Sequence, residues 1–352
     1  MKRYRLEVFD RNTLAFKCFA EATTPDIYID ALVSSESTLT CKGAIDCKRG
    51  DFAQIRIDGK VYFQGTISDL TADGNKTEIK MHQLLDLLNT QVFADVALLN
   101  TQTIEQWLTD LLTATFKGSD TFERLPNLII TSSSSTSGSH VASNDGVYNL
   151  YDLALYFFKI YGVLLDVSFD VNTKAVRIEM HSATTSVMHL DLHVSDISEY
   201  EIENSRSSDS PNKVVVKNEE DLTESATYYW HPTEFSGTID TDATTDRVVP
   251  VITQCETVKV DEDTTFADAS YARAEEILYA TRYDDLIRVT IKAESKLIST
   301  WEVGQLFTLH DGAASYNTIL TGIHAINMLY IELTFGYVRK RLTQILKMRR
   351  GN

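Results

Sequence analysis

Hydrophobic and polar residues alternate through the first quarter of the chain, in short runs separated by turn residues. Tyr4, Leu6 and Val8 alternate with charged residues, and Asp58-Gly59 and Asp73-Gly74 are hairpin signals between such runs. Many short strands at this spacing favour a β-barrel or sandwich. We therefore predict a first β-barrel domain over residues 1–92, which closes with a helix at about 82–90.

In the next hundred residues, the spacing of hydrophobic residues changes from every second position, as in strands, to every third or fourth, as in helices. Helices are predicted at about 103–116, where apolar side chains share one face, and at 149–161, which ends at a glycine. A hairpin follows at 163–180. Residues 93–199 are thus predicted as an α+β middle domain. Thr131 to Asn144 is so rich in Ser, Thr and Gly that we expect a loop that is mobile or ordered only by an interface.

Strand patterns return after residue 199. We predict a second β-barrel domain over residues 200–336, which includes a helix at 265–281, and a basic C-terminal helix over 337–352. The expected fold class is α+β and mainly β: two similar small antiparallel β-barrel domains flank an α+β middle subdomain, and a helix ends the chain.

The second barrel repeats part of the first. Gly304 lies 254 positions after Gly50, at the start of similar strands, and Glu332 lies 254 positions after Glu78, at the centre of similar strands. Between them, Gly322 lies 257 positions after Gly65, so we expect the length differences to fall in the hairpins. Chance similarity between amphipathic strands would not preserve the order of strands and turns. The repeat predicts a duplicated β-domain, a shape suited to rings and tubes.

The 352 residues have a composition typical of globular proteins, with 43% hydrophobic and 24% charged residues and a formal net charge of −17. We do not expect strong attraction to nucleic-acid phosphates, because such affinity comes from an excess of Lys and Arg. An acidic surface suits a conduit that must not retain DNA, although solubility alone also explains it. The four cysteines lack metal-site spacing, so free thiols are expected. Neither a signal peptide nor a membrane span is expected.

No group of residues predicts catalysis. His189, Asp191 and His193 would lie on one face of a strand, but ligands spaced along one strand are usually too far apart to share a metal ion. Glu201 with Glu203, or Asp284 with Asp285, would be candidate acid and base of a glycosidase only if their spacing in space allowed it. We expect no enzymatic activity, no metal and no cofactor.

The C-terminal residues carry the one concentrated positive feature of the chain. On a helix, they would form a basic rim beside an apolar stripe, which either packs on its own domain or docks on an acidic neighbour. The candidate partner-binding residues are Arg339, Lys340, Arg341, Lys347, Arg349 and Arg350.

The order of these parts resembles the baseplate or tail hub proteins of tailed bacteriophages, which include the structural N-terminal part of tail-associated lysins and the hubs of contractile injection systems. The resemblance is carried by the run from Gly50 to Ile67, the helix starting Ile104-Glu105-Gln106-Trp107-Leu108, the helix and hairpin around Leu153 to Ile178, and the second barrel run Val303-Gly304-Gln305-Leu306-Phe307. It covers nearly the whole chain, although no single motif is specific.

The resemblance implies a function at the tail tip of a phage or prophage virion, with assembly in the cytoplasm of the bacterial host. In that family, two barrels from each of three subunits form a pseudo-sixfold hub ring that joins tail tube to tip. The implied partners are two further copies of the chain, the distal tail protein, the tape-measure protein and spike or fibre proteins, and DNA passes through without specific binding. Many relatives carry a lytic or fibre extension, but this chain stops at Asn352, so no cell-wall degradation is expected. The alternatives are a carbohydrate-active enzyme or a receptor-binding module.

Overall fold

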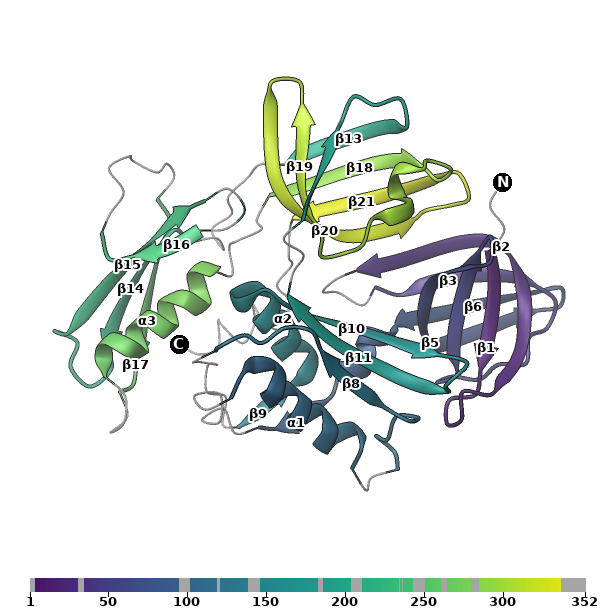
Figure 1. The fold of residues 1–352 in the computed structure, drawn as a ribbon, viewed down its shortest axis with the longest axis horizontal. Helices are drawn as coiled ribbons and strands as arrows, with labels where there is room; N and C mark the ends of the chain where they lie inside the picture. The colour runs from purple at the N-terminus through teal and green to yellow at the C-terminus, as the bar shows by residue number, and fades with distance from the viewer. Residues whose placement is uncertain are drawn as a thin grey trace.

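A computed structural model of the chain is mainly β, and its described residues form a large antiparallel sheet and three α-helices (Figure 1). It describes residues 4–30, 35–94, 102–118, 121–138, 146–182, 186–203, 211–233, 235, 237–242, 251–260, 265–279 and 285–336. Four parts are visible in Figure 1: a first β-unit in purple, a middle α/β part in blue and teal, a green part at one side, and a second β-unit with its last strands in yellow.

The first β-unit consists of six antiparallel strands whose side chains alternate between a shared core and the surface. The pairing order is β1-β4-β5-β6-β3-β2, and β1 also pairs with β2, so the path of hydrogen-bonded strands returns to its start. Leu6, Ile55 and Ile79 are fully buried inside this unit. The strands are β1 (Tyr4–Phe9), β2 (Phe16–Asp30), β3 (Ser37–Lys42), β4 (Phe52–Ile57), β5 (Lys60–Asp73) and β6 (Lys76–Gln83).

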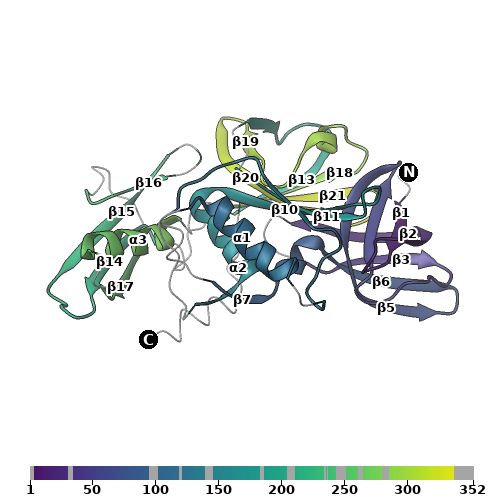
Figure 2. The same ribbon diagram turned by 60° about the horizontal axis from the view of Figure 1, so that its bottom comes forward.

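The middle part contains two helices beside a three-stranded sheet, and Figure 2 shows α1 and α2 lying together. Thr103 caps α1 and Asn149 caps α2, each through side-chain oxygen to backbone N–H hydrogen bonds, and Gly162 ends α2 in a left-handed conformation. The rings of Trp107 and Phe157 meet edge to face between the helices. The elements are η1 (Leu84–Leu88), β7 (Gln91–Phe93), α1 (Ile104–Phe116), β8 (Ile129–Ser132), β9 (Val147–Asn149), α2 (Leu150–Tyr161), β10 (Val163–Asp170) and β11 (Ala175–Ser182).

Two sequence predictions in this region need correction. The helix expected at about 82–90 is only the five-residue 3-10 segment η1, whose N-cap residue Gln83 makes no capping hydrogen bond. The first half of the Ser/Thr-rich loop is ordered within the chain, because the buried Glu105 carboxylate accepts hydrogen bonds from the Ser134 hydroxyl and from the backbone N–H and hydroxyl of Thr136. The loop is therefore held by hydrogen bonds to a carboxylate on α1, which the polar composition of the loop did not indicate. Residues 139–145 lie outside the described part.

The second β-unit has the same strand order as the first. Its order β12-β19-β20-β21-β18-β13 matches β1-β4-β5-β6-β3-β2 strand for strand, with two differences among the described strands. β12 runs parallel to β19, whereas β1 runs antiparallel to β4, and the closing β1–β2 pairing has no β12–β13 counterpart. The strands are β12 (Val187–Asp191), β13 (Ile197–Glu203), β18 (Leu286–Lys292), β19 (Leu306–Asp311), β20 (Ala314–Ala325) and β21 (Tyr330–Gly336), and a 3-10 segment, η4 (Leu297–Thr300), precedes β19.

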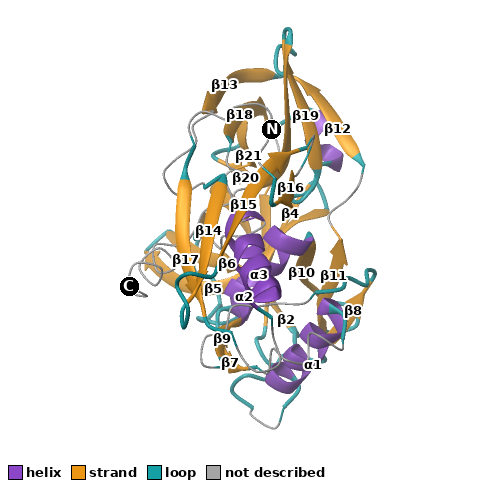
Figure 3. Cartoon of the chain, turned by 90° about the vertical axis from the view of Figure 1, so that its left-hand side faces the viewer, coloured by secondary structure: helices purple, strands orange, loops and turns teal. Residues whose placement is uncertain are grey.

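A separate four-stranded sheet is inserted between β13 and β18. Helix α3 lies on this sheet (Figure 3), and Trp230, Val214 and Ile277 meet in a core of its own. The predicted helix at 265–281 corresponds to α3, which Thr265 caps. The elements are β14 (Lys213–Asn218), β15 (Ser225–Pro232), β16 (Gly237–Asp240), β17 (Thr253–Val258) and α3 (Phe266–Leu278).

Specific contacts join the parts. The Gln64 side chain of the first unit accepts a hydrogen bond from the Phe169 backbone N–H at 3.0 Å and donates one to its carbonyl at 2.8 Å. Leu164 of β10 packs against Ile319 of the second unit in a small apolar cluster. The middle part is thus fixed to both β-units.

Candidate assembly surface

The two β-units share one sheet, because β2 of the first unit pairs with β20 of the second. The antiparallel register joins Ile27, Tyr28, Ile29 and Asp30 to Ala325, His324, Ile323 and Gly322, respectively. Pairing of β20 with β19 stops at Ile319, so the later residues of β20 have an edge that β2 can occupy. We call this β2–β20 pairing the in-chain seam.

Side chains reinforce the in-chain seam on both faces of the sheet. On the outer face, Asp26 Oδ1 lies 2.6 Å from His324 Nε2, and the Tyr28 ring stacks on His324 with centroids 3.8 Å apart. On the inner face, Ile27 and Ala325 are fully buried. Gly322 permits the close approach, since a Cβ there would lie 2.8 Å from Asp30 Oδ1. The two units are therefore held edge to edge by backbone pairing, apolar packing and a side-chain hydrogen bond.

Matching irregularities show that the two units are built alike. A β-bulge interrupts β2 between Ala22 and Thr24, and another interrupts β13 between Ile197 and Glu199. In the first, the Thr23 hydroxyl donates to the Thr40 carbonyl at 3.1 Å. In the second, the Ser198 hydroxyl makes the same bond to Thr290, also at 3.1 Å. Bulges re-aim a strand at a defined position, so their repetition is difficult to attribute to chance.

The registers also correct the match between the two sequence repeats. The sequence comparison paired Gly65 with Gly322. In the structure, Gly322 lies opposite Thr334. The first-unit equivalent of Thr334 is Lys80, and Lys80 lies opposite Asp69. Gly322 therefore corresponds to Asp69. The bulged residue Tyr62 gives β5 one residue that β20 lacks, so the offset between equivalent positions is one residue smaller along these two strands. The loop before β21 is one residue longer than the loop before β6, and the offset there returns to its first value.

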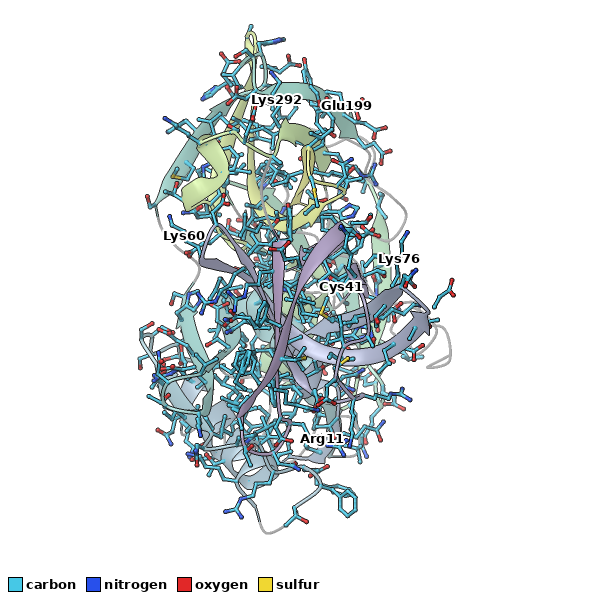
Figure 4. The ribbon with its side chains drawn as sticks, turned by 90° about the vertical axis from the view of Figure 1, so that its right-hand side faces the viewer. Arg11, Cys41, Lys60, Lys76, Glu199 and Lys292 are labelled. Atoms are coloured by element: carbon cyan, nitrogen blue, oxygen red, sulfur yellow. The ribbon has the colours of Figure 1, made fainter. Side chains whose placement is uncertain are left out.

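A continuous polar face runs across this shared sheet from β5 to β13. Residues directly opposite each other in antiparallel strands project from the same side, so the registers define rows across the sheet. One row is Asp69-Lys80-Thr38-Asp26, and another is Tyr28-His324-Glu332-Thr290-Glu199. In Figure 4, Lys76, Glu199 and Lys292 mark the surface of these two units.

Carboxylates outnumber cations on the polar face. Two acids have a cation nearby: Glu36 lies 2.9 Å from Lys80, and Glu201 lies 3.1 Å from Arg288. Further along β13, Glu199 and Glu203 are exposed. The acids on or beside this face are Asp26, Glu36, Asp69, Asp73, Glu78, Glu199, Glu201, Glu203 and Glu332, and the cations are Lys42, Lys76, Lys80, Arg288 and Lys292.

The histidine motif does not converge on one point. His189 stacks on His310, with Nδ1 3.3 Å from its Nε2, whereas His193 lies 2.9 Å from Asp311, to which the Tyr200 hydroxyl also donates. Within the described residues, no three His, Cys, Asp or Glu side chains gather closely enough to hold a metal ion. The motif is distributed over two separate contacts on β12, β19 and the loop before β13.

The other sequence candidates are separated or lie outside the described residues. Glu201 and Glu203 are exposed on β13, and Glu201 is paired with Arg288. Asp284 lies outside the described part. So does the whole basic cluster, Arg339, Lys340, Arg341, Lys347, Arg349 and Arg350.

A cavity of about 740 Å³ opens where the two β-units and the middle part meet. Its lining is mixed, with apolar residues such as Ile331 and Trp301 beside Asp30, Gln83 and His181. The His181 Nε2 atom lies 2.8 Å from Asp166, which raises the pKa of His181. None of the helices in the described ranges has the length and apolar run that crossing a membrane requires.

Sequence reasoning did not identify the strands that form the in-chain seam, and it missed the role of Glu105. Pairing between β2 and β20 joins residues nearly 300 positions apart, for which neither strand carries a local signal. The repeat was the signal that could have indicated the seam. In a duplicated unit, a strand that extends beyond its neighbours leaves unpaired backbone groups with which another strand can pair.

No protein-family model and no curated protein matches the chain. Solved structures match it over almost its full length. A tail protein from Neisseria meningitidis MC58 superposes with a TM-score of 0.58 at 12% identity, over 95% of this chain and 96% of that one. The 43 kDa tail protein of prophage MuSo2 from Shewanella oneidensis gives 0.56 at 14% identity, over 95% and 97%.

A chain of the phage P2 baseplate, in its activated conformation with Ca, gives a TM-score of 0.52 at 12% identity, over 96% of this chain and all of that one. At these identities the likeness establishes a shared fold. The fold of this chain is thus one found in tail and baseplate proteins, and it extends through all four parts.

Proposed function

We propose that this chain is a structural component of a phage or prophage tail tip. Three copies form a hub ring that joins the tail tube to the tip and lets DNA and the tape-measure protein pass. The observation that carries the proposal is the pair of β-units with one strand order, joined edge to edge within a chain that shares the fold of tail proteins over 95% of its length.

In this proposal the two units serve as tube-type β-barrels. Three subunits with two such units each would present six similar segments around a threefold axis, which matches a sixfold tube to a threefold tip. The return of the pairing path from β1 to β2 supports the interpretation of the first unit as a barrel. The shared strand order supports the same interpretation of the second.

The polar face of the shared sheet would line the channel. Its excess of carboxylates repels phosphates, so a polyanion passes without being held. We expect no shift of double-stranded DNA in a gel assay at low salt. The double variant Glu199→Lys with Glu201→Lys should create measurable, salt-sensitive DNA retention if this face is accessible to DNA. Unchanged behaviour of assembled rings would argue against the face lining the hole.

Oligomeric state tests the ring directly. Light scattering should give three chains per particle, and negative-stain images should show a ring with six similar lobes around a hole. A chain that stays monomeric at high concentration would contradict the proposal.

The proposed site of action is the virion tail tip, after assembly in the host cytoplasm. The proposed partners are the distal tail protein, the tape-measure protein and spike or fibre proteins. The basic residues after Gly336 would dock on an acidic neighbour, and the acidic polar face of a second subunit is one such surface. Replacing the six basic residues by glutamine should weaken that association in a salt-dependent manner. Equal association of both forms at low salt would refute this role.

We propose no enzymatic activity for the chain. The alternative of a carbohydrate-active enzyme would place its acids in the cavity, where Asp30 and Asp166 contribute to the lining. Clearing of a cell-wall zymogram by the purified chain would favour that alternative. Binding of the isolated chain to host cells would favour the other alternative, a receptor-binding module.

A further inference from the structure

The first β-unit has a free strand edge at the position where the second unit receives β2. Pairing of β5 with β4 stops at Thr66, and the later residues of β5 pair only with β6 among the described strands. Part of this edge is closed locally, because the Leu70 N–H donates to the Asp69 carboxylate at 2.9 Å. The open stretch is therefore Thr71 to Asp73, which is exposed.

The registers assign first-unit equivalents to residues on the β20 side of the in-chain seam. Ala325 lies opposite Ile331 and His324 opposite Glu332, just as Ala72 lies opposite Thr77 and Thr71 opposite Glu78. Ala72 and Thr71 are thus the equivalents of Ala325 and His324.

The same comparison assigns equivalents to the other side of the seam. Counting from the shared bulges, Ile202 and Glu203 of β13 correspond to Ile27 and Tyr28 of β2. Strand β13 pairs only with β18 among the described strands, and its other edge meets none of them.

We propose that subunits join through a second copy of this seam, in which β13 of one chain pairs antiparallel with the free edge of β5 in the next. Ile202 would lie opposite Ala72 of the partner subunit, and Glu203 opposite Thr71 of the partner subunit. This inference rests on the proposed ring and names the strands that close it.

Residue chemistry at the equivalent positions supports a second copy as the occupant. The in-chain seam buries an isoleucine against an alanine, Ile27 and Ala325, both fully covered. Their equivalents are again an isoleucine and an alanine, but Ile202 is only half-buried and Ala72 is exposed. Pairing between copies would cover both and continue the sheet from one subunit into the next.

The outer face of the new seam would be weaker than that of the in-chain seam. The close contact of Asp26 with His324 becomes a contact of Glu201 with the Thr71 hydroxyl, and the stacked Tyr28 ring becomes Glu203. A join without the hydrogen bond between Asp26 and His324 and without the stacked rings suits subunits that must first fold separately and then assemble.

Disulfide trapping tests this seam. In a Cys255→Ser background, which removes the exposed native thiol, Thr71→Cys with Glu203→Cys should cross-link neighbouring chains under mild oxidation, since facing strand residues lie within disulfide range. Denaturing gels should then show bands of two and three chains that disappear on reduction. The positive control is Tyr28→Cys with His324→Cys, which should form a disulfide within one chain.

The matched negative control is Thr71→Cys with Glu199→Cys. Glu199 projects from the same face of β13 but lies four residues, about 13 Å, from Glu203. Preferential cross-linking of the Glu203 pair over the Glu199 pair, with neither single variant cross-linking, is the expected result.

The outcomes separate the seam from the ring. If light scattering shows trimers but the Glu203 pair cross-links no more than the Glu199 pair, the seam is refuted and the ring survives. If the chain is monomeric and does not cross-link, both fail.

Discussion

Replacing Glu105 by alanine should destabilise the middle part by about 3 kcal/mol. The carboxylate is 2% exposed and accepts three hydrogen bonds, each of 2.7 Å, from Ser134 and Thr136. Hydrogen bonds to a charged group contribute about 1.5–3 kcal/mol, and leaving the Thr136 N–H without its acceptor costs about 1–3 kcal/mol. Because these effects share the same atoms, they are not summed, and about 3 kcal/mol is the expected size.

The effect should depend on pH in a defined direction. Burial acts to raise the pKa of Glu105, but the Thr136 N–H and the two hydroxyls outweigh it, so the pKa lies below the ordinary value of 4.5. A lowered pKa in the folded state means that the ionised group stabilises the fold above pH 4.5. This contribution is lost as pH falls through the folded-state pKa, so the difference between wild type and variant should shrink there.

The assay is urea unfolding followed by the fluorescence of Trp107, which lies on the same helix and is buried. The background substitutions Trp230→Phe and Trp301→Phe leave Trp107 as the only tryptophan, so the fluorescence reports on the middle part. Glu123→Ala, which removes an exposed carboxylate, is the control and should change stability by less than about 0.5 kcal/mol. Equal stability of the Glu105 and Glu123 variants at neutral pH would refute the argument that this carboxylate orders the loop.

Three further predictions follow from single contacts. His181→Gln should lower the free energy of unfolding by less than about 1 kcal/mol, because the partner Asp166 is exposed. Since the pKa of His181 is raised above 6.5, the full loss should appear below pH 6.5 and vanish as pH rises through the folded-state pKa. Urea titration at several pH values measures it. Gly65→Ala should destabilise the first unit by about 3 kcal/mol or prevent its folding, because the new Cβ would lie 2.2 Å from a β6 carbonyl, and an unchanged urea midpoint would contradict this. A thiol reagent should modify the exposed Cys255 first, whereas Cys41, buried and with its pKa raised to about 12, should react only on unfolding, as mass spectrometry would show.

Much of the local structure was predictable because it depends on neighbouring residues. The caps Thr103 and Asn149 and the apolar stripe after Ile104 fixed two helices, and Gly162 ended the second. Alternation predicted many strands of both β-units, but it did not identify β13. The repeat predicted that the units would correspond, although Gly65 was matched to the wrong residue, since one bulged residue shifts a register without leaving a clear trace in sequence.

Contacts between distant segments were not predictable in the same way. Glu105 looked like an ordinary helix residue, and its role appears only when Thr136, thirty-one positions later, folds back to it. The insertion of β14 to α3 between β13 and β18 was equally hidden, because each strand has the same alternating pattern whichever sheet it joins.

The sequence by itself determined many strands, the helices α1, α2 and α3, the acidic balance and the presence of two copies of one unit, since these depend on residue type and on spacing along the chain. Only the tertiary structure decided that β2 crosses to pair with β20, and that part of β5 and one edge of β13 meet no other strand within the described residues. Backbone groups at a strand edge are the same for every residue, so the choice of partner depends on where each neighbouring strand stops, which is a property of the folded sheet.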